Sequence, residues 1–320
     1  MGRGPYQKRA RLEQERLNPS LAVPTEACVQ KARPIRLSFS PDSDDIFMFW
    51  ALLNGKIDNE GLSFVADRAD TETLNTRVEG DPTSAEGADV IAVSIAQYAR
   101  VAKDYLLLPH GMSVGRGYGP VVVSLEERTL ASLAGKRIGV PGLRTTAYLV
   151  LKLLLPEFEP VVVPIAPYSR SFDVLRAKEV DAALLIHEGR LFYEREGTKK
   201  VVDIGEGWRD ATGGLPLPLG GNAIRRDLGP ELVEQVSRIC RTSIRWALEH
   251  KAEVSQALLD AETRADVGLD AKSLDRYLEM YANADTLDAP ADVRQALEVL
   301  FTRGRAAGLV PEGVRVELAP

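Results

Sequence analysis

The residues best suited to chemistry stand at the end of one short apolar run. Residues 182–186 are apolar, and His187 and Glu188 follow them. The run predicts a buried strand that ends at His187, and open α/β sheets bind ligands at the carboxyl ends of their strands. Histidine titrates near neutral pH and is scarce in this chain, which has three. Position alone leaves two interpretations of His187, a general base or a core histidine bonded to a backbone carbonyl.

A pair of threonines forms a second candidate site. Thr145 and Thr146 precede the apolar helical stretch 147–155. Two threonines at a helix N-terminus present hydroxyls together with free backbone N–H groups, and this combination suits an anion such as a carboxylate. Simple N-capping of the helix is the alternative interpretation.

Acidic residues follow the first predicted strand, residues 35–39. Ser40 begins a turn that contains Asp42, Asp44 and Asp45, and the turn leads into a helix over residues 46–53. Carboxylates near a helix N-terminus are favoured by capping and by the helix dipole. The three aspartates are therefore interpreted either as helix caps or, for Asp42 with Ser40, as one edge of a ligand site.

Two further polar residues complete the candidate set. Ser94 follows a predicted strand over residues 88–93, and its hydroxyl can cap the helix 95–101 or face a ligand. Asn75 lies in a candidate helix over residues 71–80.

The elements that must position these residues are strand–helix units in two groups. Strands are predicted at residues 35–39, 62–66, 88–93 and 105–109, and then at 119–124, 136–140, 160–165, 182–186 and 199–204; helices dominate from 228 to about 310. The glycine cluster 115–120 lacks the third glycine of a dinucleotide fingerprint and is better explained as a connection between domains. The Pro-Leu segment 215–222 is expected to be an extended second crossing.

This order predicts an α/β protein of two lobes joined by two crossing segments, with the candidate residues collected in a cleft. The larger lobe is expected to comprise residues 34–120 and 222–320, and the smaller lobe residues 121–221. Residues 1–33, which are basic and contain few large apolar side chains, are expected to be a disordered tail. His110, in a Pro-His-Gly turn, and His250, in a charged helix end, are both expected on the surface.

The amino-acid composition limits the classes of binding partner that we expect. The chain has 320 residues, 45% hydrophobic and 27% charged, and a net charge of −6, which gives no reason to expect nucleic acid or an anionic membrane as partner. Its two cysteines fit no metal spacing. It contains no apolar run near the ~20 residues that span a bilayer and no apolar core of a secretory signal, so we expect a cytoplasmic protein. The choice between monomer and homodimer stays open.

Several stretches occur together in one order over residues 35–290. They include Ser40-Pro41 with Asp45, Asn75 in Glu-Thr-Leu-Asn, the glycine cluster, Thr145-Thr146 before Ala-Tyr, His187 in Ile-His-Glu, and Gly-Leu-Pro-Leu-Pro-Leu-Gly at 214–220. This ordered set resembles the 1,4-dihydroxy-6-naphthoate synthase family of the futalosine route to menaquinone.

The resemblance implies a type II periplasmic-binding-protein-like fold. It implies cleavage of cyclic dehypoxanthine futalosine, a small carboxylate, to 1,4-dihydroxy-6-naphthoate without a metal or redox cofactor. The family's catalytic histidine matches His187, its carboxylate-binding threonine pair matches Thr145 and Thr146, and its cleft serine and asparagine match Ser94 and Asn75. One departure stands out: the family pattern Ser-Pro-Cys-Pro-Asn-Asp is here Ser-Pro-Asp-Ser-Asp-Asp, which adds carboxylates at the cleft.

Two other functions are compatible with the same fold, because fold does not fix function. One is a solute-binding protein for a small carboxylate. The histidine in the cleft and the lack of a secretory signal argue against this function. The other is a dehydratase acting on a chorismate-like acid. Glu188 is expected to be a structural partner rather than a catalytic group, because adjacent residues on a strand point to opposite faces.

Overall fold

The structure is a computed structural model that describes residues 33–84, 87–261 and 268–320. The chain divides into two units, residues 1–33 and residues 34–320. The expected disordered tail lies, apart from Arg33, outside the described residues. The second unit carries both sheets. Among its described helices, none is long and apolar enough to cross a bilayer.

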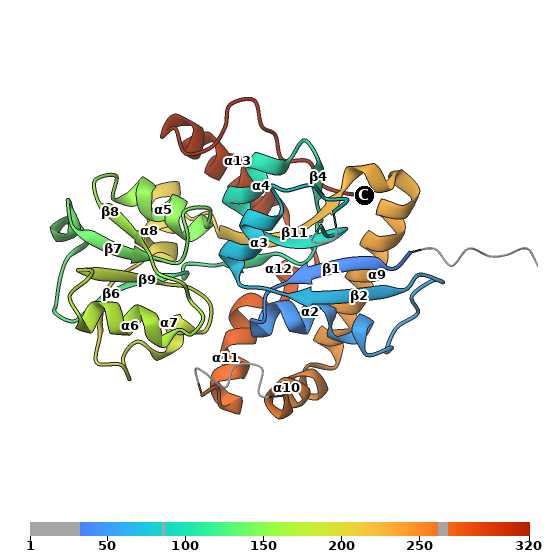
Figure 1. Cartoon of the computed structure of the whole chain (residues 1–320), viewed down its shortest axis with the longest axis horizontal. Coiled ribbons are helices and arrows are strands. Elements are labelled where there is room, and N and C mark those ends of the chain that lie inside the picture. The colour runs from blue at the N-terminus through green and yellow to red at the C-terminus, as the bar shows by residue number, and fades with distance from the viewer. Residues whose placement is uncertain (1–32, 85–86, 262–267) are drawn as a thin grey trace, which may run out of the picture. The chain divides into compact units, whose positions relative to one another are not determined.

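The larger sheet has the strand order β2-β1-β3-β11-β4, with β5 also paired to β11 (Figure 1). The strand β1 is parallel to both β2 and β3, whereas β11 runs antiparallel to β3, β4 and β5. The strands are β1 Ile35–Phe39, β2 Phe64–Arg68, β3 Val90–Ser94, β4 Tyr105–Leu107, β5 Ser113–Gly115 and β11 Leu217–Arg225.

The smaller sheet has the order β10-β6-β9-β7-β8. The three strands β8, β7 and β9 are parallel, and β6 is antiparallel to both β9 and β10. The strands are β6 Val121–Ser124, β7 Arg137–Val140, β8 Glu159–Val162, β9 Ala182–Leu185 and β10 Lys199–Asp203. The chain leaves the larger sheet after β5 and rejoins it at β11, so it crosses between the sheets twice. The expectation of two α/β lobes is confirmed.

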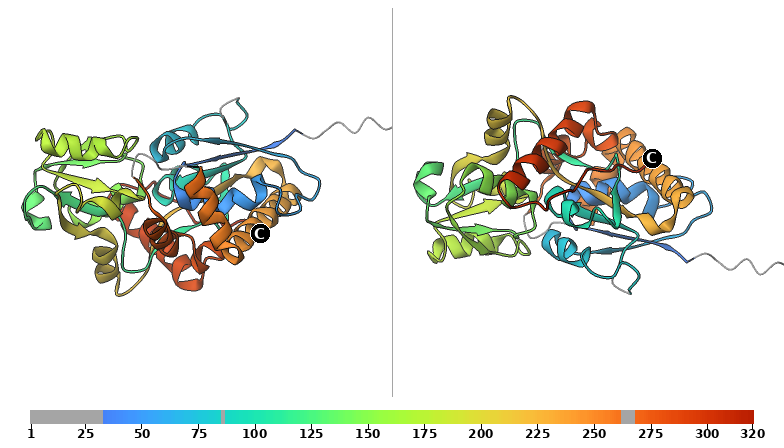
Figure 2. Two further views of the ribbon diagram at one scale, coloured as in Figure 1. Left: turned by 90° about the horizontal axis from the view of Figure 1, so that it is seen from below. Right: turned by 90° about the horizontal axis from the view of Figure 1, so that it is seen from above.

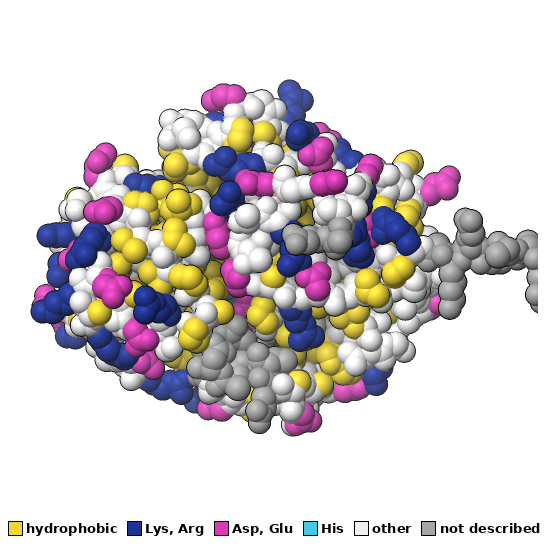
Figure 3. Space-filling view, viewed as in Figure 1, with side chains coloured by type: hydrophobic (Ala, Val, Ile, Leu, Met, Phe, Trp, Pro, Cys, Tyr) yellow, Lys and Arg dark blue, Asp and Glu magenta, His cyan; other side chains and the backbone are white. Residues whose placement is uncertain are grey.

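Helices pack around both sheets, and Figure 2 shows them from two further sides. The helices that precede β11 are α2 Ser43–Leu53, α3 Thr71–Arg77, α4 Ile95–Val101, α5 Thr146–Leu154, α6 Ser169–Arg176, α7 Gly189–Phe192 and α8 Ile204–Thr212. The C-terminal helices are α9 Pro230–Glu249, α10 Lys251–Asp260, α11 Ala271–Tyr281, α12 Ala284–Leu287 and α13 Ala291–Ala306. Short 3-10 turns lie at Leu130–Leu133 and Arg226–Leu228. On the face in Figure 3, acidic and basic side chains are intermixed.

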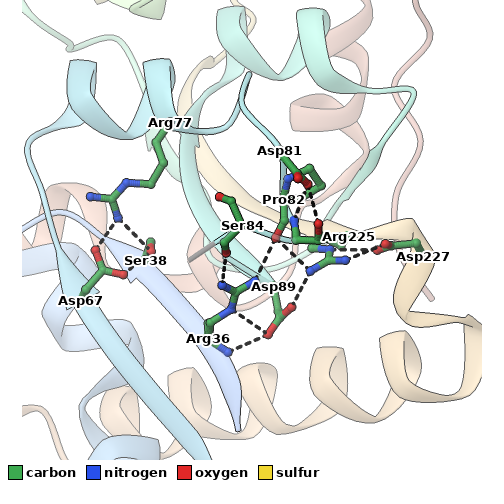
Figure 4. Close-up of polar contacts among 11 residues, drawn as sticks. Arg36, Ser38, Asp67, Arg77, Asp81, Pro82, Ser84, Asp89, Arg225 and Asp227 are labelled. Carbon is green, nitrogen blue, oxygen red and sulfur yellow. Dashed lines mark hydrogen bonds and ion pairs between the residues drawn. The ribbon is translucent and has the colours of Figure 1, made fainter. Parts of the chain in front are cut away.

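A polar network ties the larger sheet together at the amino-terminal ends of β1 and β3 (Figure 4). The Asp89 carboxylate is fully buried, and it accepts hydrogen bonds from the Arg36 backbone N–H (2.8 Å) and from Arg225 Nη1 (3.1 Å). Arg225 also donates to Asp227 at 2.8 and 2.6 Å. The network lies at the opposite end of the strands from Ser40 and Ser94, so it serves the fold rather than the candidate site.

His110 is not on the surface, and that expectation is wrong. Its side chain is fully buried, and its Nε2 lies 2.8 Å from the backbone oxygen of Ser237 in α9. Burial lowers the pKa of His110 to about 4. The helix α9, which begins 120 residues further along the chain, covers the turn, and no local pattern reports that packing. His250 is exposed, as expected.

Candidate active site

A pocket between the two sheets collects most of the predicted residues. It encloses about 720 Å³, counting the open solvent at its mouth. Its walls include five of the seven candidates, and these are Ser40, Ser94, Thr145, Thr146 and His187. Asp42 and Asn75 are not part of the wall.

His187 has an unusual backbone and a well-defined environment. It follows β9 by two residues, so the strand ends earlier than expected, and its φ of 48° lies in the left-handed region. Non-glycine residues rarely adopt that region, and such residues cluster at functional sites. Its ring nitrogens lie near the side chains of Thr71 in α3, Asp42 before α2 and Tyr277 in α11 rather than near a backbone carbonyl. The His187 side chain is 21% exposed. This environment does not support the core-histidine interpretation.

The two threonine hydroxyls are already used within the protein. Thr145 is the N-cap of α5: its hydroxyl accepts from the Tyr148 N–H (3.1 Å) and donates to the Gly142 carbonyl (2.9 Å). The Thr146 hydroxyl donates to the Leu219 carbonyl (2.6 Å). The first N–H groups of a helix have no intrahelical partner. The two hydroxyls therefore hold the helix in place, which leaves the backbone N–H groups of Thr146 and Ala147 to meet any anion that binds there.

Ser94 and Asn75 form a pair. Ser94 occupies the N-cap position of α4 but makes no side-chain capping bond. Asn75 donates to the Ser94 hydroxyl oxygen (3.0 Å) and accepts from the Ser94 backbone N–H (2.9 Å). Asn75 is fully buried behind the pocket. The structure thus gives Asn75 a position that orients Ser94, which lines the pocket.

The aspartates that precede and begin α2 do not cap it. Asp42 is at the N-cap position without a side-chain cap bond, and its carboxylate accepts from the Tyr168 hydroxyl (3.2 Å). Its other oxygen lies 3.5 Å from His187 Nε2. Asp42 is therefore in contact with the candidate base although it is not on the pocket wall, and the capping interpretation is wrong for it.

The other two carboxylates of this turn do line the pocket. Asp44 accepts from the Ser113 hydroxyl (2.7 Å), and Asp45 accepts from the Ser40 backbone N–H (2.8 Å). Burial raises the pKa of Asp44, and the nearby His187 opposes that shift. Burial raises the pKa of Asp45 to about 8, and the charge of Asp44 adds to this effect. Asp45 is therefore protonated near neutral pH.

Sequence reasoning missed three residues of the pocket wall. Thr71 at the start of α3 and Tyr277 and Tyr281 on α11 all line the pocket. Thr71 lies within the segment expected to be a helix, so its hydroxyl had a purely local explanation. The tyrosines come from an amphipathic helix near the end of the chain, where an aromatic residue is most simply explained as core. In the described part of the chain, no group of three or more His, Cys, Asp or Glu side chains is arranged to hold a metal ion.

Two sheets joined by two crossings, with a pocket between them, define the periplasmic-binding-protein-like fold. The alkanesulfonate-binding protein of Xanthomonas axonopodis pv. citri shares it, with a TM-score of 0.65 at 17% identity, over 88% of this chain and 96% of that one. The chain itself belongs to the menaquinone biosynthesis family, whose sequence pattern matches residues 35–306.

Closer relatives cover almost the same region. The 1,4-dihydroxy-6-naphthoate synthase of Thermus thermophilus is 36% identical over 282 residues, which is 88% of this chain and 97% of the relative. A crystal structure of a protein from Archaeoglobus fulgidus is similar with a TM-score of 0.78 at 42% identity, over 87% of this chain and 98% of that one.

Proposed function

We propose that this protein is a carbon–carbon lyase that converts cyclic dehypoxanthine futalosine to 1,4-dihydroxy-6-naphthoate. The observation that carries the proposal is His187, held in a left-handed backbone conformation on the wall of the pocket with side-chain partners at both ring nitrogens. The name of the Thermus thermophilus relative supports the choice of product.

The substrate carboxylate binds at the N-terminus of α5. Of the described residues that line the pocket, none is lysine or arginine. The helix dipole and the N–H groups of Thr146 and Ala147 therefore supply the attraction for a negative charge. The Ser94 hydroxyl, oriented by Asn75, donates a further hydrogen bond to the substrate.

His187 then acts as the general base. Neutral His187 removes the proton of a substrate hydroxyl, and the resulting alkoxide becomes a carbonyl as the adjacent carbon–carbon bond breaks. The electron pair of that bond moves into the ring system, which takes up a proton and becomes aromatic. No electrons are gained or lost overall, so the step needs no oxidant or reductant. General base catalysis of this kind contributes about 10²–10⁴ in rate.

The direct test is an assay of the purified protein with cyclic dehypoxanthine futalosine and, separately, with chorismate. We expect 1,4-dihydroxy-6-naphthoate from the first compound and no reaction of the second. Dehydration of chorismate would instead favour the dehydratase. Tight binding of the futalosine derivative without any product would favour a solute-binding protein and contradict the lyase.

A further inference from the structure

Tyr277 lies between the candidate base and a buried carboxylate. It is on α11, is 1% exposed, and its hydroxyl donates to Asp44 Oδ1 (3.0 Å). The same hydroxyl oxygen lies 3.3 Å from His187 Nδ1. Three residues from distant parts of the chain, Asp44, Tyr277 and His187, therefore form one chain of contacts, which we term the histidine relay.

The hydrogens of the histidine relay can be assigned in order. Asp44 is buried, and its second oxygen already accepts from the Ser113 hydroxyl (2.7 Å), so both of its oxygens act as acceptors. A tyrosine hydroxyl has one hydrogen, and here that hydrogen goes to Asp44. The Tyr277 oxygen can then only accept from His187, which requires that Nδ1 carries the proton. Neutral imidazole has one N–H, so Nε2 keeps its lone pair.

The surroundings of Nε2 fit that assignment. The Thr71 hydroxyl lies 3.0 Å from Nε2 and has a hydrogen to donate to it. Thr71 lines the pocket, so a substrate hydroxyl that enters there can take its place at Nε2. When Nε2 accepts the substrate proton, the Asp42 carboxylate oxygen 3.5 Å away faces the new positive charge. Asp42 is itself held by the Tyr168 hydroxyl (3.2 Å).

We propose that Asp44 and Tyr277 are positioning residues that hold neutral His187 in its Nδ1–H tautomer, so that Nε2 is the atom that removes the substrate proton. The inference rests on the proposed function for the identity of the substrate, but the His187 tautomer is a property of the free protein. The two can therefore fail separately.

The tautomer is measurable by ¹⁵N nuclear magnetic resonance of histidine-labelled protein, because the chain has only three histidines. His187→Asn identifies the His187 signals by their disappearance. In the wild-type protein, at a pH where His187 is neutral, we expect a protonated Nδ1 and an unprotonated Nε2. A protonated Nε2 in the neutral ring would overturn the proposal, whatever any variant shows.

Tyr277→Phe removes the relay hydroxyl and keeps the ring. We expect it to shift neutral His187 towards the Nε2–H tautomer and to lower kcat by at least about tenfold, with a smaller change in KM. Tyr281→Phe is the matched control for the spectrum: Tyr281 is on the same helix and bonds to Arg190 rather than to His187, so the His187 tautomer should not change. An unchanged tautomer and unchanged kcat in Tyr277→Phe would contradict the relay.

The two proposals have distinguishable failures. If the wild-type protein shows the Nδ1–H tautomer but does not turn over cyclic dehypoxanthine futalosine, the histidine relay stands and the proposed reaction falls. If turnover is present with the Nε2–H tautomer, the reaction stands and the relay falls.

Discussion

Glu188 joins the two lobes by accepting two hydrogen bonds from Ser43, 145 positions earlier in the chain. Its Oε1 accepts from the Ser43 backbone N–H (3.0 Å) and from the Ser43 hydroxyl (2.8 Å), and both residues are fully buried. Glu188 directly follows His187. The contact that joins the lobes at this point therefore also fixes the residue next to the candidate base.

Removal of this acceptor should weaken the link between the lobes. Glu188→Ala deletes two hydrogen bonds to a carboxylate, each worth about 1.5–3 kcal/mol, and leaves the buried Ser43 N–H without its acceptor. We expect KM for the proposed substrate to rise at least about tenfold in steady-state kinetics. Glu188→Gln retains an oxygen at the same position and should lie between the wild type and the alanine variant. Kinetics of Glu188→Ala equal to those of the wild type would show that substrate binding does not depend on this contact.

The Asp89–Arg225 pair should dominate the stability of the larger sheet. Removal of one partner of a buried ion pair costs about 3–5 kcal/mol, because the other charge remains buried. Asp89→Ala should lower the free energy of unfolding by that amount in urea titrations. The control is Asp227→Ala, which removes the other partner of Arg225. The Asp227 side chain is 58% exposed, so the loss should be at most about 1 kcal/mol. Equal losses of unfolding free energy in Asp89→Ala and Asp227→Ala would show that burial of the ion pair does not determine its contribution to stability.

His110 should make the protein less stable as the pH falls. Its pKa in the folded protein is lowered to about 4 by burial, from an ordinary value of 6.5. Between those values the unfolded chain binds the extra proton and the folded chain does not, so stability is lost as the pH falls. His110→Gln keeps a donor for the Ser237 carbonyl and does not titrate. The stability of the wild type relative to this variant should fall by about 2 kcal/mol from about pH 7 to about pH 5. If the difference in stability between the wild type and His110→Gln stayed constant across this pH range, the lowered pKa of His110 would be contradicted.

Asp45, in contrast to His110, should make the protein less stable as the pH rises. Burial raises its pKa from 3.8 to about 8, so over that interval the folded protein holds a proton that the unfolded chain has lost. The wild type therefore loses stability as the pH rises towards about 8. Asp45→Asn removes this loss, and an oxygen at the same place can still accept from the Ser40 N–H. We expect the variant to gain at least about 1 kcal/mol over the wild type between about pH 5 and about pH 8, measured by thermal or urea unfolding. If the stability of Asp45→Asn relative to the wild type instead increased as the pH fell, the raised pKa of Asp45 would be contradicted.

Local patterns were enough to predict much of this fold. The first strand matches β1 at both ends, and Thr145 is the N-cap before an apolar helix that starts one residue earlier than predicted. The end of an apolar run was enough to predict that His187 lies at the pocket. These features depend on periodicity and capping, which act over a few residues.

The remainder of the site depends on contacts that no local pattern contains. Tyr277 meets Asp44, 233 positions earlier, and Thr71 meets His187, 116 positions later. Asp45 in isolation is a favourable first-turn carboxylate of a helix, and only the burial created by the complete fold raises its pKa. His110 illustrates the same point, because a turn that is typical of a surface is covered by a helix from much later in the chain.

The measurement that bears most directly on the account is the turnover and substrate affinity of His187→Asn. If His187 is the general base, the variant should bind cyclic dehypoxanthine futalosine with near wild-type affinity in calorimetry, while kcat for the formation of 1,4-dihydroxy-6-naphthoate falls about 10²–10⁴-fold. Turnover close to that of the wild type would contradict the account.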